Sequence, residues 1–305
     1  MSTDNQQLND ALAANYMLVD IQIRSWGATA TDQAASDEVR KLKGANPKAG
    51  KFVTNLLAGA DAELTEVRQL ASSIRDFVYG NTLPWSNNLD GAKRGSRLVD
   101  ARNIMGFLKE LNGRVQEHNA AVVRLQAVWQ QRIQEALVNL GGLGDLSKYP
   151  TAADIPNKFS VAVDVRPVPS MHDFKRVGIP AELAEALAAR QAEQDQVLAQ
   201  NALDDLKGRI LEELQRMAKQ LAKAGRGEKT RLYDSLVTNM QGLVALARSM
   251  NMRNSPELAA LADRIERELL AHPVEVYRNS TDAAAEVAQA ASKLAVDAAI
   301  EEIWK

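Results

Sequence analysis

The chain has 305 residues, of which 25% are charged, and its formal net charge at pH 7 is -2. That balance gives no global reason to expect a nucleic acid or an anionic membrane as partner, although a local basic patch remains compatible with it. Cysteine is absent, which excludes disulfides, thiolate nucleophiles and cysteine-ligated zinc, and we expect a reducing, cytoplasmic location.

The length suffices for one large or two modest domains. Aromatic residues make up only 5% of the chain, a composition that favours helices packed through aliphatic side chains over a β-sandwich or barrel. The first 17 residues have neither a basic nor an apolar region typical of a signal peptide. Because no apolar run approaches the roughly 20 residues that span a bilayer, we expect no membrane contact.

Two segments alternate apolar and polar side chains with a period of two. The first covers residues 17–26 and the second covers residues 159–166, where Pro167 and Pro169 follow. This period predicts half-buried strands. A lone strand leaves its backbone groups unsatisfied, so we expect the two segments to pair with each other as a two-stranded ribbon.

Between these segments the sequence predicts a short helix over 32–43, an amphipathic helix over 61–79, a loop over 81–97 and a long helix over 98–140. Apolar positions in the long helix recur in alternating steps of three and four, which is typical of a helix packed along its length against another helix. We expect self-association through this seam. Its predicted members are Leu111, Val115, His118, Val122, Leu125 and Trp129.

Further helices are predicted over 181–223, 229–252, 255–271 and 281–304. Ser255 followed by Pro256 is a helix start with proline in the first turn. The predicted fold is therefore mainly α: an elongated, coiled-coil-like bundle of long helices with one small β ribbon. We expect an N-terminal helical domain over 1–169 and a C-terminal helical region over 170–305.

No group of residues in the sequence has the spacing of a catalytic or metal site. His118, His172 and His272 fall in three different predicted elements, without the i+4 pairing of helical metal ligands. The Gly-rich stretches at 141–144 and 225–231 each follow a helix, whereas phosphate-binding loops follow a strand. We therefore expect no enzyme activity, no cofactor and no metal.

Basic residues gather in two clusters, over 40–51 and 93–97, and the stretch 39–60 contains no acidic residue. Single-strand binders combine cations that follow phosphates with aromatic faces on which bases stack. Solvated loops or a protein partner explain the same pattern, and all three interpretations remain open. If a nucleic-acid surface exists, we expect the two clusters to converge on one basic face with Trp85 at its edge. Its predicted members are Arg40, Lys41, Lys43, Lys48, Lys51, Trp85, Lys93, Arg94 and Arg97.

Three stretches, taken in order, carry a family resemblance: MLVDIQIRSWGATATDQAAS, NTLPWS and FSVAVDVRPVP. Over residues 16–220 the chain resembles a family of uncharacterised helical proteins encoded mostly by tailed bacteriophages and prophages. The resemblance implies no activity and no catalytic residues. Because such genes are often found near a MoxR-like AAA+ ATPase, it implies a role as adaptor or substrate of an ATPase machine in the host cytoplasm.

These observations predict a non-enzymatic helical scaffold of phage type that forms homo-oligomers and contacts an AAA+ ATPase. The alternative is a single-stranded nucleic-acid-binding protein in phage replication or recombination.

Overall fold

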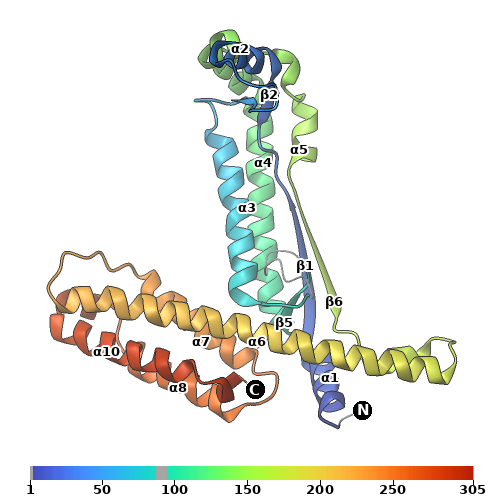
Figure 1. The fold of residues 1–305 in the computed structure, drawn as a ribbon, viewed down its shortest axis with the longest axis vertical. Helices are drawn as coiled ribbons and strands as arrows, with labels where there is room; N and C mark the ends of the chain where they lie inside the picture. The colour runs from blue at the N-terminus through green and yellow to red at the C-terminus, as the bar shows by residue number, and fades with distance from the viewer. Residues whose placement is uncertain (1–2, 87–94, 305) are drawn as a thin grey trace. The chain divides into compact units, whose positions relative to one another are not determined.

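The structure, a computed structural model, describes residues 3–86 and 95–304 and is mainly helical, with two small sheets (Figure 1). The helices are α1 (Thr3–Asn15), α2 (Gln33–Lys43), α3 (Ala62–Asn81), α4 (Ile104–Leu140), α5 (Ile155–Lys158), α6 (Ala181–Gly225), α7 (Ser235–Ser249), α8 (Pro256–Leu269), α9 (Val274–Asn279) and α10 (Thr281–Ala298). The strands are β1 (Tyr16–Arg24), β2 (Thr29–Asp32), β3 (Phe52–Asn55), β4 (Leu83–Pro84), β5 (Arg97–Asp100) and β6 (Ser160–Pro167). None of the helices in the described ranges is both long enough and apolar enough to cross a membrane.

The larger sheet has the strand order β4-β5-β1-β6, and the smaller one pairs β2 with β3. The predicted neighbours β1 and β6 are therefore confirmed, but the predicted limit of two strands is wrong. The segment 97–100, predicted as the end of a loop and the start of a helix, is strand β5. Its four residues are buried and pair antiparallel with β1, from Tyr16 opposite Asp100 to Val19 opposite Arg97. Helix α4 begins only at Ile104, after a 3-10 turn capped by Asp100.

The chain forms two compact units that interleave along the sequence. Unit 1 contains residues 1–20, 78–106 and 164–305, and unit 2 contains residues 21–77 and 107–163. Strands β1 and β6 and helices α3 and α4 each begin in one unit and end in the other. The predicted boundary between residues 169 and 170 divides the chain once, whereas these units divide it at four places.

Unit 1 is built on α6, whose apolar stripe is buried as its helical period predicts. The stripe consists of Leu203, Leu206, Ile210, Leu214, Met217 and Leu221. Helix α10 lies along α6 (Figure 1), and the approach is so close that a Cβ atom on Gly225 would lie 2.8 Å from the Cβ of Ala285. Glycine at the end of α6 therefore permits this contact. The predicted start of α8 is confirmed, since the Ser255 side chain accepts a hydrogen bond from the backbone N–H of Leu258.

A buried carboxylate, that of Asp195, lies between α1 and α6 in unit 1. The Asn9 amide donates to Asp195 Oδ2 at 2.5 Å, and the Gln191 amide donates to Oδ1 at 2.9 Å. Burial raises the pKa of the Asp195 carboxyl, and these two hydrogen bonds lower it only in part. The folded chain therefore keeps the Asp195 proton at pH values where the unfolded chain has lost it.

We predict that Asp195 makes the free energy of unfolding fall as pH rises from about 4, the ordinary carboxyl pKa, through the raised pKa of the folded chain. The ionised carboxylate carries the desolvation cost, so stability is higher where it is protonated. Urea denaturation between pH 3.5 and 7 measures this slope. Asp195→Asn is expected to flatten it, so that the stability of this variant relative to wild type rises with pH.

The matched control is Asp204→Asn, because Asp204 accepts from Gln200 on the same helix at the same spacing but is exposed. Equal pH slopes for the two variants would contradict the assignment to Asp195.

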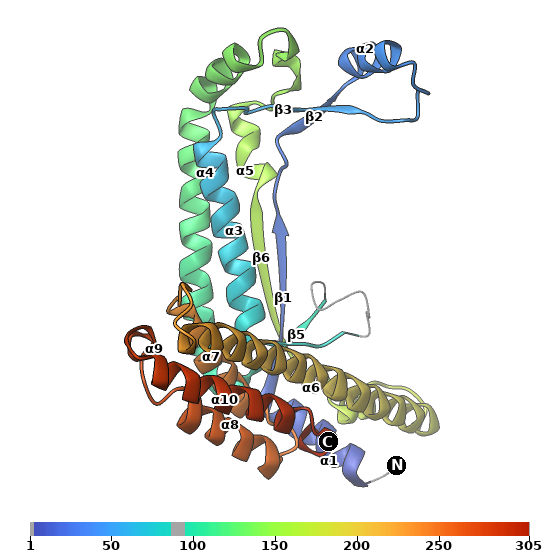
Figure 2. The ribbon, with the colours of Figure 1, turned by 60° about the vertical axis from the view of Figure 1, so that its left-hand side comes forward.

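In unit 2, α3 and α4 run side by side (Figures 1 and 2). Their apolar stripes bring Leu64 and Val67 of α3 into one core with Leu125 and Trp129 of α4. The same core includes residues outside the helices: Ala28, Leu57, Ala60 and Phe159. The α4 stripe is therefore shared between a helix and several connections, and the structure does not confirm a coiled-coil bundle.

His118 of α4 is fully buried, and its Nε2 has no hydrogen-bond partner among the described residues. Its other ring nitrogen lies 3.3 Å from the side-chain oxygen of Asn119. A buried polar atom without a partner costs about 1–3 kcal/mol relative to an apolar group of similar shape.

We therefore predict that His118→Leu raises the free energy of unfolding by about 1 kcal/mol, measured by urea denaturation at pH 7.5. The same change at the exposed His272 should stay within about 0.5 kcal/mol of wild type. A loss of stability in His118→Leu would show that the histidine makes a contact worth more than this cost.

Candidate functional site

The basic tip comprises residues 29–55 of unit 2: strand β2, helix α2, the loop after it and strand β3. Strand β2 pairs antiparallel with β3, from Thr29 opposite Asn55 to Asp32 opposite Phe52. Asp32 caps α2 by accepting from the backbone N–H of Ala35 at 3.0 Å. At the other end Gly44 adopts the left-handed conformation with φ of 58°. This conformation favours glycine, so the sequence ends the helix where the chain must turn back toward β3.

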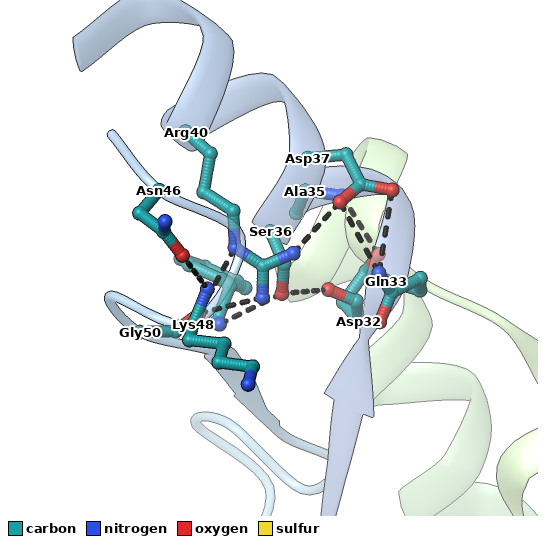
Figure 3. A network of polar contacts seen from close by, with 10 residues as sticks. Asp32, Gln33, Ala35, Ser36, Asp37, Arg40, Asn46, Lys48 and Gly50 are labelled. Atoms are coloured by element: carbon teal, nitrogen blue, oxygen red, sulfur yellow. Dashed lines mark hydrogen bonds and ion pairs between the residues drawn. The ribbon is translucent and has the colours of Figure 1, made fainter. Parts of the chain in front are cut away.

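A network of polar contacts holds the loop of the basic tip against α2 (Figure 3). The Arg40 guanidinium donates to Asp37 at 2.8 Å and to the carbonyl of Gly50 at 2.6 and 3.1 Å. Ser36 Oγ donates to the carbonyl of Asp32 and accepts from the backbone N–H of Phe52 at 2.9 Å. The network therefore joins the helix, the loop and both strands of the tip.

Four lysines of the basic tip have exposed side chains: Lys41, Lys43, Lys48 and Lys51. Their ammonium groups form no ion pair with any carboxylate of the described residues. Arg40 differs, because its side chain is only 14% exposed and is engaged within the tip. The available positive charge of the tip is thus carried by lysine.

An apolar pocket of about 220 Å³ lies between α2 and the loop. Val39, Ala45, Ala49 and Phe52 line it, together with the stems of Arg40, Lys43 and Lys51. Leu42 and Val53 add exposed apolar surface to the tip, and Leu42 is 80% exposed. An apolar pocket with a cationic rim is suited to binding a partner that carries both apolar groups and negative charge.

An aromatic cluster around Trp129 of α4 holds both ends of the basic tip. The ring of Trp26, just before the tip, meets the Trp129 ring edge-on at 5.8 Å. Trp129 Nε1 donates to the carbonyl of Pro150 at 2.8 Å. The neighbouring Tyr149 hydroxyl donates to the carbonyl of Leu56, just after the tip, at 2.5 Å. The tip is therefore attached to the helices of unit 2 at its entry and at its exit.

The structure contradicts part of the predicted nucleic-acid face. Trp85 is only 6% exposed and belongs to the apolar core of unit 1, so it offers no face for base stacking. Arg97 is also buried: its guanidinium donates to Thr82 Oγ1 at 2.6 Å and lies 4.5 Å over the Tyr79 ring. Burial, aided by the nearby Arg209, lowers the pKa of Arg97 to about 10. Lys93 and Arg94 lie outside the described residues.

The predicted self-association seam of α4 is covered by its own chain. Val115 is partly buried, and the other five members are buried: Leu111, His118, Val122, Leu125 and Trp129. Val122, Leu125 and Trp129 share one core with α3 and the adjoining connections, so the spacing at these positions is explained within unit 2. These side chains are therefore not an exposed surface of the chain, and self-association stays a prediction.

Unit 1 contains a second cleft, of about 610 Å³, that no sequence pattern indicates. Its lining comes from distant segments and includes Arg97, Arg209 and Glu213. Arg209 forms an ion pair with Asp205 at 2.6 Å and donates to the carbonyl of Tyr79 at the end of α3. Glu213 pairs with Arg216 at 2.6 Å. The charged groups of Arg209 and Glu213 in this cleft are thus engaged with other parts of the fold. The lysines of the basic tip are not, so the tip is the stronger candidate site.

No protein-family model, no curated protein and no solved structure matches this chain.

We predict that Arg40→Ala frees the loop of the basic tip. The variant loses hydrogen bonds from a largely buried guanidinium, which should cost about 1–3 kcal/mol of local stability. Trypsin should then cleave after Lys48 and Lys51 about tenfold faster, because cleavage follows local opening. Mass spectrometry of timed digests measures both sites.

Arg124→Ala is the control, since Arg124 pairs with Glu66 at 2.6 Å at an exposed position of unit 2. It should leave cleavage in the tip unchanged. Equal rates in wild type and Arg40→Ala would mean that the polar network does not restrain the loop.

Proposed function

We propose that this chain is a non-enzymatic interaction protein, in which the helices of unit 2 form a scaffold that presents the basic tip to a negatively charged macromolecule. The observation that carries the proposal is the set of four exposed lysines in the basic tip, none of them ion-paired within the described residues, of which Lys43 and Lys51 line an apolar pocket. Among those residues, no three histidine, aspartate or glutamate side chains are grouped to hold a metal ion.

Binding of single-stranded nucleic acid is the second candidate, and Phe52 is the observation that favours it. This ring is 37% exposed and lines the pocket beside the stems of Lys43 and Lys51. Stacking on a base requires an accessible aromatic face. Phe52 has such a face, whereas the buried Trp85 does not.

The adaptor role and the oligomeric state belong to the same proposal. An AAA+ ATPase of a phage neighbourhood is the partner that the family resemblance suggests, and it would contact the basic tip. Homo-oligomers would have to use a surface other than the covered seam. Val123 and Val138 on the exposed face of α4 are suited to such a contact, since both are large apolar side chains open to solvent.

We predict that replacing the four lysines of the tip by glutamine abolishes most binding to anionic polymers. The probes are fluorescein-labelled poly-glutamate and a labelled oligo-dT, each measured by anisotropy at 50 mM salt. Wild type should bind at least one of them, with an affinity that falls as salt rises because counterions are released. The quadruple variant should bind at least about tenfold more weakly and with a smaller salt slope.

The control replaces four exposed lysines outside the tip by glutamine: Lys109, Lys219, Lys229 and Lys293. It changes the net charge by the same amount and should bind like wild type. Absence of binding to both probes, or equal losses in the two variants, would refute the basic tip as the binding surface.

A further inference from the structure

We propose that the pocket of the basic tip receives one large apolar side chain from an acidic segment of a partner protein, while the surrounding lysines bind the carboxylates that flank it. This proposal rests on the proposed function of the tip and adds to it the class of partner and the anchor that enters the pocket.

The first argument is that the basic tip buries polar side chains and exposes apolar ones, the reverse of an ordinary folded segment. Its two most buried side chains, Ser36 and Thr54, are polar, whereas Val39, Leu42 and Val53 are exposed. These three apolar side chains therefore do not form a core within the tip, which is held by polar contacts instead. An exposed apolar cluster with a polar rim is typical of an interaction site.

The second argument is that the pocket exists before any partner binds. The bonds from Arg40 to the Gly50 carbonyl fix the loop wall, and the bond between Ser36 and the Phe52 N–H fixes the β3 wall. A partner side chain would therefore enter a formed site and would not have to order a loop. A single anchoring side chain in such a pocket commonly provides much of the binding energy of an interface.

The third argument is charge complementarity. The stretch 39–60 carries five basic residues and no acidic one. On the preceding turn of α2, Asp37 is engaged by Arg40, and Glu38 is exposed. The residues that line the pocket include Arg40, Lys43 and Lys51 and no acidic residue, so an anchor flanked by aspartate or glutamate is attracted and one flanked by lysine or arginine is repelled.

The same features favour a protein segment over a nucleic acid. Aliphatic groups of Val39, Ala45 and Ala49 form much of the pocket wall, and they match an aliphatic or phenyl side chain better than a base that must stack and hydrogen-bond. Leu42 and Val53 add further exposed apolar side chains to the basic tip, and a phosphate backbone would gain nothing from them. Single-strand grooves instead combine cations with several aromatic platforms.

The test uses the full chain and a labelled 12-residue peptide that has one central leucine flanked on each side by glutamates. Anisotropy at 50 mM salt is expected to show binding by wild type. Ala49→Trp, which fills the pocket from an exposed loop position, should weaken binding at least tenfold. Ala127→Trp, the same change at an exposed site of α4, should bind like wild type.

Changes in the peptide test the pocket without altering the fold. Replacing its leucine by alanine should weaken binding to wild type at least tenfold, and replacing its glutamates by glutamine should abolish binding. If the alanine peptide and Ala49→Trp both bind as well as their parents, the pocket inference is wrong while charge-based binding stands. If oligo-dT binds and the leucine peptide does not, the partner is a nucleic acid and the inference is overturned. If neither probe binds, the proposed function fails as well.

Discussion

The position of Trp129 is the constraint on which the basic tip, the proposed binding surface, depends. A pair of four-residue strands is marginal on its own, and the basic tip adds little apolar core to hold them. Trp129 compensates by packing against Trp26 before the tip and by bonding to the chain beside Tyr149, whose hydroxyl reaches the carbonyl after the tip. Both ends of the basic tip are therefore attached to the α3–α4 core, and its polar network holds the loop against α2.

Long segments could be predicted from the sequence because a hydrophobic period that repeats many times identifies a helix or a strand by itself. The stripe of α6 repeats over many turns, and β1 and β6 alternate over eight or nine residues, so each pattern specifies its element without knowledge of its neighbours. Short segments carry no such information. Strand β5 has four residues, all buried, and its strand conformation comes from pairing with β1. The interleaved units are beyond prediction for the same reason, since they depend on which distant segments pack together.

The candidate site was predicted in part. The basic cluster over 40–51 could be found because the absence of acidic residues is a property of the sequence itself. Its aromatic component was assigned to Trp85, which follows Pro84 in a polar stretch that looks exposed, but β4 and β5 place it in the core of unit 1. Phe52 could not be identified from the sequence, because the pocket that it lines forms only when the loop folds back onto α2.

Arginine and lysine have separate roles in this chain, and counting them together overstates the charge available to a partner. A guanidinium offers several donors in a fixed plane and so connects neighbouring segments, whereas an ammonium on a flexible stem stays hydrated. Arg40 connects α2 to its loop, and Arg97 and Arg209 bind carbonyls near the end of α3. The lysines of the tip make no such connections. A basic cluster in the sequence therefore contains two groups: arginines that connect segments of the fold, and lysines whose charge stays available to an anionic partner. Only the lysines should govern the salt dependence of an interaction.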